Sequence, residues 1–174
     1  MGRDLRALIG VLAVSLMITG VAAPARGAGG GGGGGGGAET SPAKPEDKDY
    51  TAGVKAIEAG NYAAAIPLLE AVVARDSTNA DAYNWLAYAV RKNGNAAAAI
   101  PIYEKALAID PKHRGAHEYI GEAYLVLDDL PKAKQHLAVL DRLCFLPCSQ
   151  YRDLKKAVEA YEKSGGKLKP QAAK

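Results

Sequence analysis

The chain carries one ten-residue segment twice, and the two copies are 34 residues apart. The segment from Asn61 to Glu70 reads NYAAAIPLLE, and the segment from Asn95 to Glu104 reads NAAAAIPIYE. On both sides of these Asn residues, apolar residues recur every three or four positions, which is the spacing of an amphipathic helix. A period of this length indicates helical hairpins that stack on one another, because a single hairpin cannot bury its apolar face alone.

The same period divides residues 46–147 into three units, 46–79, 80–113 and 114–147. In the middle unit, the positions of the pattern W-x2-L-G-x2-Y, A-x3-F and a closing Pro are held by Tyr83, Leu86, Ala87, Val90, Ala99, Tyr103 and Pro111. On these positions the chain resembles the tetratricopeptide repeat family. The resemblance implies an all-α fold, a right-handed α-solenoid of three helical hairpins with a C-terminal capping helix.

Residues 148–163 have the pattern expected of that capping helix. Ser149 is the expected N-cap, and one apolar face is formed by Tyr151, Leu154, Val158 and Tyr161. Together with the three hairpins, this helix gives seven helices in total.

Turn residues separate the two halves of each hairpin, at Gly60-Asn61, Gly94-Asn95 and Asp128-Asp129. We expect small residues to let the paired helices approach closely, with Gly53, Ala87 and Gly121 facing Ala65, Ala99 and Ala133.

The amino-terminal residues 1–25 have the parts of an export signal, a basic start, an apolar run from Ala7 to Ala23 and a small-residue exit. Cleavage is expected after Ala25 or after Gly27. An uncleaved anchor is the alternative, because the run approaches the lower limit of about 17 residues for spanning a bilayer. Cleavage predicts a periplasmic or secreted protein, and membrane contact is expected only if the signal is retained.

Two further segments are predicted to be disordered. Residues 26–45 include nine consecutive Gly and are predicted to form a Gly-rich linker, and residues 164–174 form a short basic tail.

Cys144 and Cys148 are four positions apart, just before the capping helix. In an exported chain this spacing predicts a disulfide bond. The C-x3-C segment is similar to the end of exported bacterial tetratricopeptide proteins. Reduced thiols remain an alternative, as does a periplasmic thiol-redox or copper-handling protein that uses the two Cys, with His136 the nearest His in sequence.

The sequence gives little support to nucleic-acid binding, metal binding or catalysis. The net charge of +3 gives no general basis for binding nucleic acid. His117 and Glu118 begin a H-E-x-x-H pattern, but Gly121 stands where the second His is required, so burial is the expected role of His117. We therefore expect no metal site, no cofactor and no enzymatic activity.

The resemblance implies a non-catalytic protein–protein interaction module or scaffold of the bacterial cell envelope, a monomer or weak oligomer that binds a peptide or helix in a concave groove. Five positions of each repeat line that groove in the family. Of the fifteen residues at these positions, the ten expected to contact a partner are Tyr50, Val54, Asp81, Asn84, Tyr88, Arg91, Lys92, Glu118, Glu122 and Leu125.

Chaperone-tail binders of the family clamp a terminal carboxylate with Lys and Asn at two of these positions, which Tyr50 and Val54 occupy here. We instead expect apolar anchors at Tyr50, Tyr88 and Leu125 and a basic contact near Glu118 and Glu122. Trp85 is expected to pack against a neighbouring repeat, and a position in the groove is its alternative.

Overall fold

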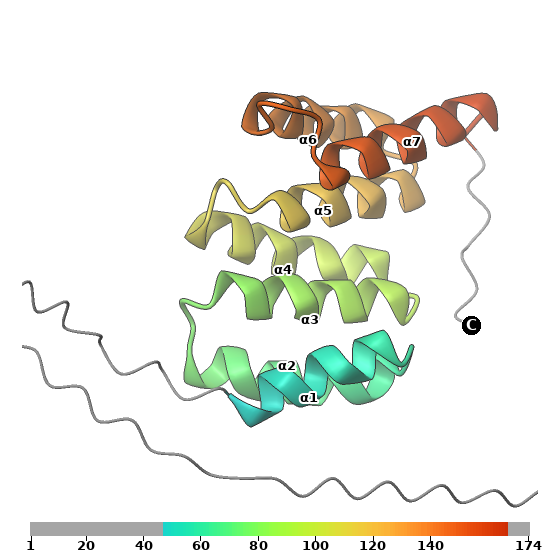
Figure 1. Ribbon diagram of the computed structural model, residues 1–174. Coiled ribbons are helices and arrows are strands. Elements are labelled where there is room, and N and C mark those ends of the chain that lie inside the picture. The colour runs from blue at the N-terminus through green and yellow to red at the C-terminus, as the bar shows by residue number, and fades with distance from the viewer. Residues whose placement is uncertain (1–46, 167–174) are drawn as a thin grey trace, which may run out of the picture. The chain divides into compact units, whose positions relative to one another are not determined.

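Seven α-helices account for most of residues 47–166, the part of the chain that this computed structural model describes. They stack in chain order, from α1 and α2 at one end to α6 and α7 at the other (Figure 1). No strand occurs among these residues, so the fold is an all-α solenoid. The helices are α1 (Lys48–Glu58), α2 (Tyr62–Arg75), α3 (Ala80–Lys92), α4 (Ala96–Ile109), α5 (Arg114–Val126), α6 (Leu130–Leu143) and α7 (Ser149–Lys163).

The second helix of each hairpin begins at the turn residue that the sequence predicts. Asn61, Asn95 and Asp129 are the N-caps of α2, α4 and α6, and each side chain accepts a hydrogen bond from a backbone N–H of the first helical turn. The residue before each cap has a positive φ, 74° at Gly60, 98° at Gly94 and 63° at Asp128. Gly adopts this conformation without strain and Asp tolerates it, which explains why these residue types recur at the turn.

The first helices of the second and third hairpins are also capped by side chains, an Asn for α3 and a His for α5. Asn79 caps α3, and His113 caps α5 by accepting a hydrogen bond through Nδ1 from the backbone N–H of Ala116, 3.1 Å away. Pro67 and Pro101 lie inside α2 and α4, where both helices continue past them. Each Pro removes one backbone hydrogen bond from its helix.

Two clusters of buried side chains form the core. The larger cluster is built from α3 to α7 and includes Tyr103, Ile120, Leu140 and Leu154, each no more than 1% exposed. The smaller cluster is built from α1, α2 and α3 around Ile57, Leu69 and Leu86. Within the described residues α3 alone contributes buried side chains to both clusters, so it joins the first hairpin to the rest of the stack.

The partners of the small residues differ in part from the expectation. Leu69 is the nearest side chain to Gly53, and Leu154 is the nearest side chain to Gly121, rather than Ala65 and Ala133. A Cβ on Gly121 would lie 2.6 Å from Leu154 Cδ2, so the missing side chain makes room for a Leu on another helix. These Leu neighbours could not be predicted from the pattern, because a helical repeat pattern identifies the face of a residue but not every side chain that covers it.

Helix α7 packs against α5 and α6 and covers the end of the stack. Its buried residues are Leu154, Val158 and Tyr161, which were all expected on its apolar face. The expected N-cap was wrong: Cys148 takes the cap position without a side-chain hydrogen bond, and Ser149 is the first helical residue. The backbone of Cys148 is extended, with φ −75° and ψ 166°, and Ser149 is already helical, so α7 begins one residue earlier than expected.

Replacing Ala99 by Leu should lower the free energy of unfolding by about 1–3 kcal/mol. Ala99 is fully buried in the larger cluster, where additional methyl groups would force neighbouring side chains out of their preferred rotamers. Urea denaturation followed by circular dichroism measures the change. Ala98→Leu on the exposed surface of the same helix is the matched control. Equal stability of the two variants would contradict the proposed repeat register.

Several sequence expectations concern residues outside the described part. The export signal at 1–25, the linker at 26–45 and the tail from residue 167 onward all lie there. Within residues 47–166, none of the helices has both the length and the apolar character needed to cross a bilayer.

Candidate functional site

The candidate site lies on the first helices of the hairpins, which supply all ten residues predicted to contact a partner. Tyr50 and Val54 are partly buried on α1, and Tyr50 packs against the smaller core cluster. Helix α3 provides five of the ten and α5 provides three. Some of the ten residues, such as Tyr88 and Arg91, lie in or beside a group of aromatic rings, whereas others, such as Leu125, lie in the core.

Four partly exposed aromatic side chains form what we call the aromatic cluster, Tyr62, Trp85, Tyr88 and Tyr119. The rings of Tyr88 and Tyr119 are 4.8 Å apart between centroids, and Trp85 meets Tyr88 edge to face at 5.7 Å. Tyr62 joins from α2, with its ring 6.2 Å from that of Tyr88. Offset and edge-to-face contacts of this kind are favourable, so the rings hold one another in place.

Arg91 lies against this cluster. Its guanidinium carbon is 5.2 Å from the ring centroid of Tyr88 and 5.7 Å from that of Tyr119. Its Nη2 forms an ion pair with Glu122 Oε2 at 2.8 Å, and the Arg91 side chain is only 8% exposed. The buried guanidinium of Arg91 thus joins α3 to α5, and its positive charge compensates the negative charge of Glu122.

Glu118 lies one helical turn before Glu122 on the same face of α5. It is 8% exposed. Burial raises the pKa of its carboxyl to about 8, with further contributions from the negative charges of Glu122 and Asp153. Near neutral pH this carboxyl therefore holds a proton for much of the time in the unliganded protein.

Two further predicted contact residues are buried more deeply than Glu118. Leu125 is 1% exposed and belongs to the larger core cluster, so it offers almost no surface to a partner. The prediction that Leu125 is an apolar anchor for a partner is therefore wrong. Asn84 is 3% exposed, and its Oδ1 has no hydrogen-bond partner among the described residues. Its Nδ2 lies close to Gly115 of α5.

The remaining two predicted contact residues, Asp81 and Lys92, contact other side chains of the protein. Asp81 Oδ1 lies 3.0 Å from His113 Nε2, so this carboxylate holds the ring that caps α5. Lys92 Nζ lies 5.8 Å from the ring centroid of Tyr62. Both side chains border the aromatic cluster or the cap of α5, and neither is at the centre of the site.

The sequence did not predict Tyr119 as a member of the candidate site. Trp85 was expected to pack between repeats, and it lies in the aromatic cluster as well. Both occupy the sixth position of their repeats, which is not among the family's groove positions. Trp85 does contact a neighbouring repeat, through Tyr119, but it does so within the aromatic cluster. The coincidence of two rings at one repeat position was a signal that could have identified them.

His117 and His136 take part in a different set of contacts. His117 is 7% exposed and lies with Nδ1 2.9 Å from Nδ1 of His136. Because the carbonyl of Pro111 can only accept, His117 Nε2 donates to it at 3.0 Å, which leaves His117 Nδ1 to accept from His136. Burial and the proximity of His117 lower the pKa of His136 to about 4. The pair thus links α5 to α6.

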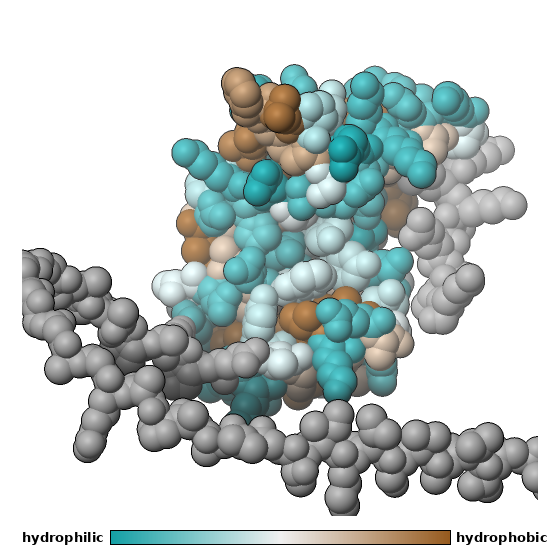
Figure 2. All heavy atoms as spheres, in the orientation of Figure 1, coloured by the Kyte–Doolittle hydropathy of each residue, from teal (hydrophilic) through white to brown (hydrophobic). Residues whose placement is uncertain are grey.

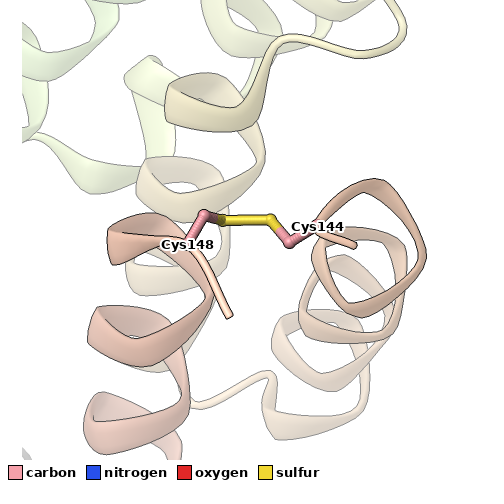
Figure 3. The surroundings of a disulfide bond; sticks show 2 residues. All are labelled: Cys144 and Cys148. Carbon is pink, nitrogen blue, oxygen red and sulfur yellow. A yellow bond between two sulfur atoms is a disulfide. The ribbon is translucent and has the colours of Figure 1, made fainter. Parts of the chain in front are cut away.

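Cys144 and Cys148 join the end of α6 to the start of α7 (Figure 3). Their sulfur atoms are at bonding distance, and their Cα atoms are 5.7 Å apart, within the usual range for a disulfide. Between them, Phe145 is fully exposed and Leu146 is 75% exposed. Figure 2 shows a mostly hydrophilic surface with separate hydrophobic areas, one of them at the end of the stack where α6 and α7 lie.

No group of three or more His, Cys, Asp or Glu side chains converges in a way that could hold a metal ion anywhere in residues 47–166.

Two tetratricopeptide repeat family models match the sequence, one over residues 50–114 and the other over residues 90–158. A comparison with curated proteins found no match.

Several solved structures have the same fold. The tetratricopeptide domain of Sgt2 from Aspergillus fumigatus has a TM-score of 0.62 at 23% identity, over 75% of this chain and 89% of that one. The Yersinia enterocolitica type III secretion chaperone SycD, in complex with a peptide of the translocator YopD, has a TM-score of 0.59 at 17% identity, over 67% and 92%.

A third similar structure is the second tetratricopeptide domain of human RPAP3 in complex with an HSP70 peptide. It has a TM-score of 0.58 at 24% identity, over 63% of this chain and 91% of that one. The two family models together extend over the three hairpins and into α7, in agreement with this likeness of fold. The chain therefore belongs to the tetratricopeptide repeat family.

Proposed function

We propose that the chain is a non-catalytic interaction module of the bacterial cell envelope, periplasmic or secreted, that binds a peptide or helical segment of a partner protein over the aromatic cluster. The observation that carries the proposal is the cluster itself. Three of its rings, Trp85, Tyr88 and Tyr119, belong to the first helices of adjacent repeats and remain partly exposed. Aromatic side chains of this kind commonly dominate the binding energy of protein interfaces.

The similar structures support a peptide as the partner. SycD and the RPAP3 domain are both seen with bound peptides, and both have the fold of this chain. An apolar or helical segment would place its side chains against exposed rings in the same way as other helices that dock on hydrophobic surfaces.

The envelope setting is supported by the export signal predicted in residues 1–25 and by the Cys pair, since disulfides persist in oxidising compartments. Amino-terminal sequencing of the protein from a periplasmic fraction tests the setting. A mature protein that begins at residue 26 or 28 is expected, and recovery of the intact chain only from the cytosol would contradict it.

Selection from a random 12-residue peptide library displayed on phage tests the binding function. We expect recovered peptides to bind the wild-type chain and to lose about 30-fold or more in affinity for the double variant Tyr88→Ala, Tyr119→Ala, as is typical when interface hot spots are removed. Tyr151→Ala is the matched control, because Tyr151 is a partly buried Tyr on α7 outside the cluster.

Circular dichroism must show that both variants are folded. If the library yields no binding peptide, or if the double variant binds as well as the control, the aromatic cluster is not the binding surface.

A further inference from the structure

The carboxyl group of Glu118 lacks the partner that a buried charge normally has. Glu118 is only 8% exposed, yet within residues 47–166 it makes no hydrogen bond and no ion pair. Buried carboxylates are usually paired, because removing an ionised group from water without compensation is costly. The absence of a partner indicates that the native environment of this group is incomplete in the isolated chain.

The oxygens of Glu118 nevertheless remain within reach of solvent. In the described part of the chain, the fully buried side-chain atoms without a hydrogen-bond partner are Asn84 Oδ1, Arg91 Nε and Tyr103 OH. The Glu118 oxygens are unpaired but are not in this set, so they keep some contact with the surface. A ligand group can therefore reach them.

The charges around Glu118 are mainly negative. Glu122 on α5 and Asp153 on α7 both act on its carboxyl as like charges, and Arg91 on α3 acts as the opposing cation. Arg91 is already committed to Glu122 by an ion pair of 2.8 Å. Tyr119 and Tyr88 are the other titratable groups close enough to be influenced by Glu118. Three carboxyl groups thus share one guanidinium, and a further cation would offset part of the excess negative charge.

We infer that Glu118 receives a Lys or Arg side chain of the bound peptide, so that the partner of this surface carries a basic residue beside apolar ones. This inference rests on the proposed function, since it concerns the ligand of the same surface. Arg91 shows the required chemistry within the chain itself, because it combines a Glu on α5 with the faces of Tyr88 and Tyr119. A ligand cation at Glu118 would likewise gain a charge-assisted hydrogen bond and lie beside aromatic rings.

Binding of such a cation should be coupled to the release of a proton. The pKa of Glu118 in the free protein is about 8 because of burial and of the charges of Glu122 and Asp153. An ion pair with the ligand lowers this pKa, so below pH 8 the ligand must displace a proton. Affinity for a basic peptide should therefore rise with pH, by up to about tenfold per pH unit, and level off above pH 8.

Phage selection on the wild-type chain and on Glu118→Gln, with the same random 12-residue library, provides the test. Gln keeps the size and shape of the side chain, and Glu159→Gln on the exposed surface of α7 is the matched control. We expect peptides selected on the wild type and on the control to be enriched in Lys or Arg at one fixed position, and this enrichment to disappear on Glu118→Gln.

One recovered peptide and its variant with norleucine at the basic position are then titrated against each protein. Trp85 is the single Trp of the chain and lies in the aromatic cluster, so its fluorescence reports binding. The basic peptide should bind the wild type about 10- to 100-fold more tightly than the norleucine peptide at pH 8, the ratio expected of one charge-assisted hydrogen bond. Glu118→Gln should bind both peptides equally, with no dependence on pH between 6 and 8.

The outcomes separate the two proposals. A library that yields no binder overturns the proposed function. Peptides that bind without a preferred basic residue, or a basic peptide that binds Glu118→Gln as tightly as the wild type, overturn the present inference and leave the proposed function in place.

Discussion

Replacing Leu154 by Ala should lower the free energy of unfolding by about 2–5 kcal/mol. Leu154 is fully buried and packs directly against Gly121 of α5, so truncating it would leave a cavity in the core. Helix α7 is the last element of the stack and packs only on α5 and α6 within the described residues, so losing this contact weakens the whole end of the domain.

Urea denaturation followed by circular dichroism measures this loss, with Lys156→Ala on the exposed side of α7 as the control. The control should stay within about 0.5 kcal/mol of the wild type. A loss of less than 1 kcal/mol for Leu154→Ala, roughly the value for an ordinary surface change, would show that α7 is not a stabilising cap.

A second substitution identifies the contact responsible. Gly121→Ala alone should destabilise the domain, because its Cβ would lie within 2.6 Å of a Leu154 methyl carbon. In the Leu154→Ala background the same change should be stabilising, since the clash is gone and Ala favours a helix by about 1 kcal/mol over Gly. A change of sign between the two backgrounds is direct evidence that the residues touch. Equal effects in both backgrounds would contradict the close approach of α5 and α7.

Replacing Arg91 by Ala should cost about 3 kcal/mol, the lower end of the range for breaking a buried ion pair. The loss would leave Glu122 without a counter-ion beside Glu118 and Asp153. The lower end applies because the Glu122 side chain is 29% exposed and water can compensate part of the charge. The loss should be smaller at pH 5 than at pH 8, because the raised pKa of Glu118 means that it is neutral at pH 5 and increasingly charged towards pH 8.

An exposed ion pair in the same chain is the control for Arg91. Lys134 and Glu162 form an ion pair between side chains that are 51% and 43% exposed, so Lys134→Ala should cost less than about 1 kcal/mol. Adding Glu122→Gln to Arg91→Ala should recover part of the stability by removing the uncompensated charge. Chemical denaturation at pH 5 and pH 8 measures all of these variants. Equal losses for Arg91→Ala and Lys134→Ala would contradict the structural role of the buried pair.

The helical architecture could be predicted from the sequence because its determinants are local. The apolar period and the turn residues depend only on neighbours in the chain, and Asn61, Asn95 and Asp129 do cap the helices that they were expected to begin. The proximity of Cys144 and Cys148 also follows from a spacing of four residues.

The candidate site could be predicted only in part, because it depends on contacts between repeats. Family positions selected Tyr88, Arg91 and Glu122, which the structure places in or beside the aromatic cluster, but they also selected Leu125, which is buried in the core. They omitted Tyr119, whose ring meets Tyr88 from the next repeat. Helical periodicity assigns a side chain to a face, whereas its exposure depends on the angle and spacing at which the next helix packs.

The division of the core into two clusters has a consequence for local opening. The smaller cluster lies between α1, α2 and α3, and the larger one extends from α3 to α7. The first hairpin can therefore separate from α3 while the side chains of the larger cluster stay packed. In a stack whose stability is the sum of neighbouring interfaces, such a partial opening needs less free energy than unfolding the whole domain. Amide protons of α1 and α2 should accordingly exchange with solvent earlier than those of α4 and α5.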